Sequence, residues 1–125
     1  MQNAQQQQYL KVQVETASPG ELTLLLYQEM VKSLLQAKRL YSLSQYEDMN
    51  QALFKVKAIL SELLITLNMD YDIAKELHDL YSFYNRHLAE FMIKREVSML
   101  EDVLEFARGM AETWKLAIRT IKTGA

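Results

Sequence analysis

Apolar residues recur every three or four positions through most of the chain, and this spacing constrains the fold more than any other feature. Between residues 45 and 67, alternating steps of four and three connect Met49, Leu53, Val56, Leu60, Leu63 and Leu67. Such spacing places these side chains on one face of an α-helix. The 125-residue chain has only three glycines and one proline, too few for the many tight turns of an all-β domain. The sequence therefore predicts an all-α fold.

Helix-start signals divide the chain into four segments. Three serines are followed by a glutamate three residues later, the spacing of a capping box: Ser18 and Glu21, Ser44 and Glu47, Ser98 and Glu101. Pro19 also suits the first turn of a helix. A fourth and weaker start has Asp70 or Asp72 as its cap. These signals predict helices over residues 19–41, 45–67, 71–94 and 97–122.

The predicted helices form one domain. The connections between them are short, and short connections make neighbouring helices antiparallel. We expect an antiparallel up-down four-helix bundle over residues 18–123. Before it, residues 1–17 are expected to form a disordered Gln-rich tail and an extended arm, in which Leu10, Val12 and Val14 alternate with polar residues.

Each of the other predicted helices has a core stripe like that of residues 45–67. In chain order these stripes are Leu26, Met30, Leu34 and Tyr41; Ile73, Leu77, Leu80, Tyr84, Leu88 and Phe91; and Leu100, Leu104, Ala107, Ala111, Trp114, Ile118 and Ile121.

The residues that catalysis or metal binding requires do not occur in the necessary patterns. The chain has no cysteine, and its net charge of −2 argues against general binding to nucleic acids. His78 and His87 lie about half a turn out of phase on one predicted helix. In helical bundles that bind two metal ions a glutamate stands three residues before a histidine ligand, and neither histidine here has one at that position. No glycine-rich phosphate loop and no apolar run long enough to cross a bilayer is visible. We predict no enzyme activity, no cofactor, no metal site and no membrane insertion, with the cytoplasm as the simplest location.

Several predicted helices carry apolar residues outside the core stripe. In residues 45–67, Phe54, Ala58 and Ile65 lie opposite that stripe. The other helices contribute Leu24, Phe83, Met99, Phe106 and Met110. Wide apolar arcs can fill a thick bundle or lie beneath the arm, but exposed apolar rows usually mark partner sites. Their spacing suits grooves that accept amphipathic helices. The residues thus predict a binding module for apolar helical segments, with a homodimer through the same rows as the alternative.

Six motifs occur in a fixed order between Tyr9 and Ile121. They are Tyr9 itself, the run from Val14 to Leu22, Leu25-Leu26-Tyr27, Lys55-x-x-x-Ile59-Leu60-x-Glu62-Leu63, Leu77-x-x-Leu80-Tyr81 and Ala111-x-x-Trp114-Lys115. Together they resemble the flagellin-specific export chaperone family (FliS). The block from Thr16 to Pro19, with its upstream tyrosine, is the most specific of these motifs.

The resemblance implies a cytoplasmic chaperone of bacterial flagellar assembly. Such a protein binds the disordered C-terminal region of flagellin, prevents premature polymerisation and delivers flagellin to the flagellar type III export gate. By position, Tyr9 is the tyrosine of the arm, and Thr16, Ser18 and Pro19 form its hinge and helix cap. We expect a monomer or weak homodimer whose client contacts Tyr9, Val14 and the eight outer apolar residues named above. The alternative is a homo-oligomeric structural bundle or a general helix-binding adaptor.

Overall fold

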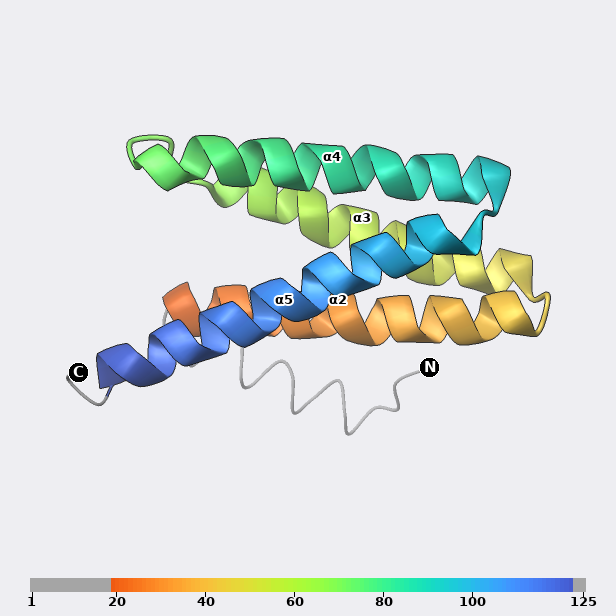
Figure 1. Cartoon of the computed structure of the whole chain (residues 1–125), viewed down its shortest axis with the longest axis horizontal. Helices are drawn as coiled ribbons and strands as arrows, with labels where there is room; N and C mark the ends of the chain where they lie inside the picture. Colours follow the sequence, from red (N-terminus) through yellow and green to blue (C-terminus); the bar gives the residue numbers. More distant parts are fainter. Residues whose placement is uncertain (1–18, 123–125) are drawn as a thin grey trace.

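Four α-helices joined by short connections make up the described part of the chain (Figure 1). The computed structural model describes the backbone of residues 19–122 and the side chains of residues 20–120. The helices are α2 (Pro19–Ser42), α3 (Tyr46–Thr66), α4 (Asp72–Lys94) and α5 (Val97–Lys122). The predicted all-α four-helix bundle is confirmed, and each predicted helix boundary lies within about one residue of the observed one. The predicted tail and arm, residues 1–17, lie outside the described residues.

Consecutive helices run antiparallel, and α5 returns to pack against α2 (Figure 1). The most extensive helix contacts join α2 to α3 and to α5, whereas α4 makes smaller contacts with α3 and α5. Along its length α5 diverges from α4 towards its C-terminal end (Figure 1). The bundle therefore consists of a tightly packed set, α2 with α3 and α5, to which α4 is more loosely joined.

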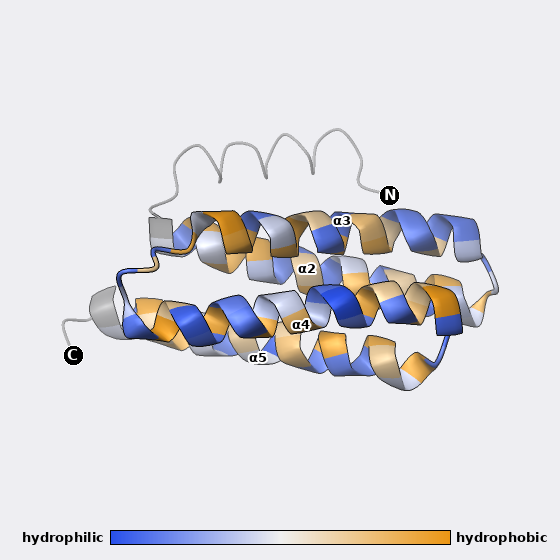
Figure 2. Ribbon diagram, turned by 90° about the horizontal axis from the view of Figure 1, so that it is seen from above, coloured by the Kyte–Doolittle hydropathy of each residue, from blue (hydrophilic) through white to orange (hydrophobic). Residues whose placement is uncertain are grey.

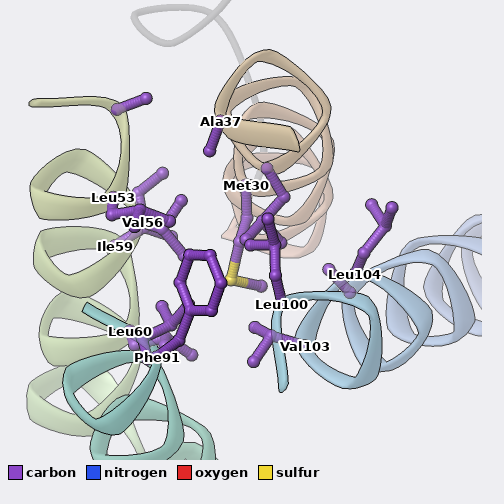
Figure 3. Close-up of a cluster of buried hydrophobic side chains, with 14 of the residues drawn as sticks. Met30, Ala37, Leu53, Val56, Ile59, Leu60, Phe91, Leu100, Val103 and Leu104 are labelled. Carbon is purple, nitrogen blue, oxygen red and sulfur yellow. The ribbon is translucent and has the colours of Figure 1, made fainter. Parts of the chain in front are cut away.

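One apolar cluster holds the helices together. All four ribbons alternate between apolar and polar residues, as amphipathic helices require (Figure 2). Figure 3 shows Met30 of α2, Leu60 of α3, Phe91 of α4 and Leu100 of α5 pointing into a common core, where each side chain is fully buried. The core stripe predicted for α3 is buried from Met49 to Leu63. Removal of these side chains from water is the main favourable contribution to folding.

Three of the four predicted helix starts have their caps within the described residues, and none of these predicted caps is confirmed. Ser44 does not cap α3; it adopts a left-handed conformation with φ 58° and closes α2 instead. The amide of Gln45 donates to the carbonyl of Leu40 at 2.9 Å and the amide of Ser44 to that of Tyr41 at 3.0 Å, the pattern of a Schellman motif. The N-cap of α3 is Gln45, which makes no side-chain capping bond.

The other two predicted caps are also wrong. Tyr71, rather than Asp70 or Asp72, is the N-cap of α4, and it makes no side-chain capping bond. Ser98 already lies inside α5, which begins at Val97. The predicted boundaries hold because serine and aspartate favour turns by several mechanisms, of which capping is only one.

The buried row of α4 also differs from its predicted stripe. Ile73 is 62% exposed and Leu80 is 40% exposed, whereas Ala74 and Tyr81 are buried in their place. In the first half of α4 the buried row is therefore shifted by one position along the sequence. The observed rotation of α4 turns Tyr81 towards Tyr27 of α2 and Phe106 of α5, and it leaves Ile73 and Leu80 at the surface.

Candidate functional site

The outer row predicted on α3 is exposed. Phe54 is 52% exposed and Ile65 is 79% exposed, and Ala58 between them is exposed too. All three lie on the face of α3 opposite its buried residues. Large apolar side chains on an otherwise polar face are candidates for partner contact.

The other predicted contact residues that lie within residues 20–120 are less accessible, with one exception. Phe83 on α4 is exposed, whereas four others are partly buried: Leu24, Met99, Phe106 and Met110. The last three pack against the hydrophobic core and thus contribute to the fold as well. Tyr9, Val14, Thr16 and Ser18 lie outside the described residues, and the backbone of Pro19 begins α2.

Apart from Ile65, sequence reasoning missed the exposed apolar side chains around the connection between α3 and α4. Exposed apolar side chains gather at and near the end of the bundle that holds this connection: Ile65, Met69, Tyr71, Ile73 and Leu80. We call this end of the bundle the open end and these side chains the open-end patch. Ile73 and Leu80 are seven residues apart and share one face of α4. The available signal was the unusual number of apolar residues between positions 63 and 73, which is more than one helix end can bury.

An aromatic cluster connects exposed Phe83 to the interface between α4 and α5. The Phe83 ring lies 5.0 Å from that of Tyr84 and stacks on His87 at 5.3 Å. Tyr84 in turn stacks on Phe106 of α5, with 4.2 Å between ring centroids. His87 Nε2 lies 3.1 Å from Asp102 Oδ2 and adds a polar link between the two helices. This cluster supports Phe83 from beneath and leaves one side of its ring in solvent.

Polar contacts reinforce the interface between α3 and α4. Lys57 Nζ donates to the carbonyl of Asn85 at 3.0 Å and also to the side-chain oxygen of Asn85. Burial lowers the pKa of Lys57. Such a contact holds α3 and α4 together, because the amine donates to two oxygens of Asn85.

A buried pair of tyrosines crosses the bundle from α2 to α4. The hydroxyls of Tyr27 and Tyr81 are hydrogen-bonded, and both residues are almost completely buried. Burial raises the pKa of both phenols, so both keep their protons at neutral pH. Beside them, Trp114 Nε1 donates to the carbonyl of Gly20 at 3.0 Å and ties α5 to the start of α2. Sequence reasoning did not find the tyrosine pair.

Metal-ligand clusters and membrane-spanning stretches are the next features to consider in residues 20–120. Among them, no cluster of three or more histidine, aspartate or glutamate side chains could hold a metal ion. His78 is exposed and lies on a different part of α4 from His87, with its nearest carboxylate 3.5 Å away on adjacent Asp79. None of the four helices is apolar over a stretch long enough to span a bilayer.

Comparison with known proteins identifies the family. The model of the family described as flagellar protein FliS matches residues 1–121. The chain belongs to the FliS family. It is 32% identical to the flagellar secretion chaperone FliS of Bacillus subtilis (strain 168), over 90% of this chain and 84% of that protein. It is 30% identical to the flagellar secretion chaperone FliS of Vibrio cholerae serotype O1 (strain ATCC 39315 / El Tor Inaba N16961), over 86% and 84% respectively.

Four of the six motifs that carried the resemblance lie wholly within the described residues. Membership of the FliS family confirms the assignment made from those motifs. Two motif residues, Tyr27 and Tyr81, form the buried pair, and a third, Trp114, makes the bond to Gly20. These positions are structural, so the exposed apolar residues remain the candidates for binding a partner.

Proposed function

We propose that the chain is a cytoplasmic flagellar export chaperone that binds the C-terminal region of flagellin. In this role it prevents premature polymerisation of flagellin and passes it to a component of the flagellar export gate. Membership of the FliS family, whose two matched relatives are named flagellar secretion chaperones, supports this proposal. The names of these relatives also favour a chaperone over an enzyme.

The observation that carries the proposal is the exposed apolar row on α3. A disordered client loses conformational entropy when it orders on a partner, so it needs a large apolar surface in return. Burial of one large apolar side chain contributes about 1.5–3 kcal/mol. Phe54 and Ile65 on α3, with Phe83 on α4, offer side chains of this kind in solvent. Their exposure supports a client that contributes an amphipathic helix.

Calorimetric titration of the chain with the C-terminal segment of flagellin from the same organism tests the proposal. We expect tight one-to-one binding with a large negative heat-capacity change, the signature of apolar burial with coupled folding. Absence of binding heat at several temperatures would contradict the assigned client.

Two variants connect this binding to α3. Phe54→Glu places a charge in the exposed row and should weaken binding at least about tenfold, because the new carboxylate would lose its hydration in the complex. Gln36→Glu makes the same change of charge at an exposed position of α2 and serves as the control. If Phe54→Glu unfolds the protein, the α3 row belongs to the core and is not a binding surface.

The alternative is a homo-oligomeric bundle that uses the same exposed rows. Sedimentation analysis separates the two functions, because a chaperone is expected to be a monomer or weak homodimer that forms a one-to-one complex with its client. A stable dimer with no affinity for flagellin would favour the structural bundle.

A further inference from the structure

The first half of α4 is joined to the core by few side chains. In all of α4, four residues are buried, and only Ala74 and Tyr81 lie in its first half. Ala74 is small, and its neighbour Ile73 is largely in solvent. Tyr81 is therefore the large fully buried side chain of this half of α4, and Leu77 packs against the core only partly buried.

Tyr81 makes its hydrogen bond across the bundle and not to an adjacent helix. The main packing partners of α4 are α3 and α5, yet Tyr81 meets the hydroxyl of Tyr27 from α2. The other polar links of α4, at Asn85 and His87, join adjacent helices; the link at Asn85 is partly buried and the link at His87 is exposed. Of these links in the described part of the chain, the tyrosine pair is the one placed within the hydrophobic core.

A buried hydroxyl pair constrains position more than it adds stability. Two phenylalanines would fill nearly the same volume, and replacement of both partners of a buried hydrogen bond is often nearly neutral in stability. A hydrogen bond nevertheless has a narrow range of distance and angle, whereas apolar contacts between helices tolerate sliding and rotation. In some proteins, buried polar groups are retained because they select one packing arrangement.

We propose that the Tyr27–Tyr81 pair is a positioning contact that fixes the placement of the first half of α4 on the bundle. Ile73 and Leu80 of the open-end patch lie on the same half of α4, so their position is fixed with it. That these side chains meet the client rests on the proposed function, whereas the placement of α4 does not.

Three variants test this contact: Tyr27→Phe, Tyr81→Phe and the double variant. Each single change leaves one buried hydroxyl without its partner and should lower the thermal midpoint, and the double variant should recover most of this loss. Tyr84→Phe is the matched control on α4, because the ring of Tyr84 stacks on Phe106 and no interhelical hydrogen bond of its hydroxyl is seen within residues 20–120.

The decisive measurement is residue-resolved amide hydrogen exchange of the free full-length chain. In the double variant, amides of residues 76–84 should exchange about tenfold faster than in wild type, while those of α2 and α3 are unchanged. The Tyr84→Phe control should exchange like wild type. Equal protection of α4 in the double variant and wild type would overturn the proposal. Uniform acceleration across all four helices would also overturn it, since the pair would then contribute only general stability.

Titration with the C-terminal segment of flagellin then separates this inference from the proposed function. If the segment binds wild type, the double variant should bind it severalfold more weakly despite its near-normal thermal midpoint, and equal affinity would overturn the connection to the client. If wild type does not bind, the proposed function fails, and hydrogen exchange alone still decides whether the pair positions α4.

Discussion

The two ends of the bundle are held by different kinds of contact. The α2–α3 and α4–α5 connections lie at one end of the bundle, which we call the closed end. Four residues contact one another there: Tyr41, Tyr46, Phe91 and Arg95. The Arg95 guanidinium lies 3.8 Å above the Tyr46 ring, and the Tyr41 hydroxyl donates to the Arg95 carbonyl at 3.1 Å. The rings of Tyr41 and Phe91 lie 5.7 Å apart. The α4–α5 connection thus contacts the end of α2 and the start of α3 directly.

The opposite end holds the α3–α4 connection, the start of α2 and the end of α5 (Figure 1). Here α5 diverges from α4, and the open-end patch remains in solvent. Parts of a protein with few buried contacts open at lower free energy than its core and are often those that bind partners. The closed end is thus joined by ring and hydrogen-bond contacts, and under the proposed function the open end is the part that we expect to bind the client.

Phe91→Ala should cause the largest effect, because Phe91 is fully buried at the closed end. Truncation of a buried phenylalanine leaves a cavity and costs about 3–5 kcal/mol of unfolding free energy. Urea denaturation measures this loss. Phe83→Ala on the same helix is the control and should cost clearly less, because the Phe83 ring is half-exposed. Equal losses at both positions would mean that the closed end is not the more tightly packed part of α4.

Trp114→Phe tests the strongest polar link observed near the open end. The substitution keeps an aromatic ring near Tyr27 but removes the donor to the Gly20 carbonyl. Loss of one hydrogen bond should cost about 0.5–1.5 kcal/mol, and the last turns of α5 should exchange their amide hydrogens faster than its first turns. Unchanged exchange in α5 would show that this bond does not hold the C-terminal half of α5 to α2.

The sequence predicted the helices better than it predicted their rotation. Apolar spacing is a local property, so it located all four helices, and even the wrong cap at Ser44 marked the right turn. It did not distinguish the row containing Ile73 and Leu80 from the adjacent row containing Ala74 and Tyr81. Rows one residue apart differ by only about 100° around a helix, and the choice between them depends on where α5 lies.

The candidate site was predicted in part for the same reason. The exposed row on α3 follows from the sequence, because Phe54 and Ile65 oppose a compact core stripe. The tyrosine pair does not follow from it, since Tyr27 and Tyr81 lie 54 positions apart and meet only when both helices have their observed rotations. Motif resemblance marked both tyrosines without indicating what they contact.

Ser44→Gly should stabilise the protein through the turn at the closed end. Ser44 has a φ of 58°, a conformation that strains most L-residues and that glycine adopts freely. The substitution should raise the free energy of unfolding by about 0.5–1 kcal/mol, as measured by urea denaturation. Client affinity should stay unchanged, because the closed end is assigned to the fold. A change in affinity without a change in stability would contradict the division between the two ends.

The smallest effect on stability, and the sharpest comparison, comes from two isoleucines at opposite ends of α4. Ile73 at the open end is 62% exposed and Ile93 at the closed end is 83% exposed, so replacement of either by serine should change the unfolding free energy by less than about 0.5 kcal/mol. Ile73→Ser should nevertheless weaken binding of the flagellin segment about tenfold, because it removes apolar area from the open-end patch. Ile93→Ser should bind like wild type in the same titration. If Ile93→Ser loses as much affinity as Ile73→Ser, the client covers both ends of α4 and exposure alone does not mark its site.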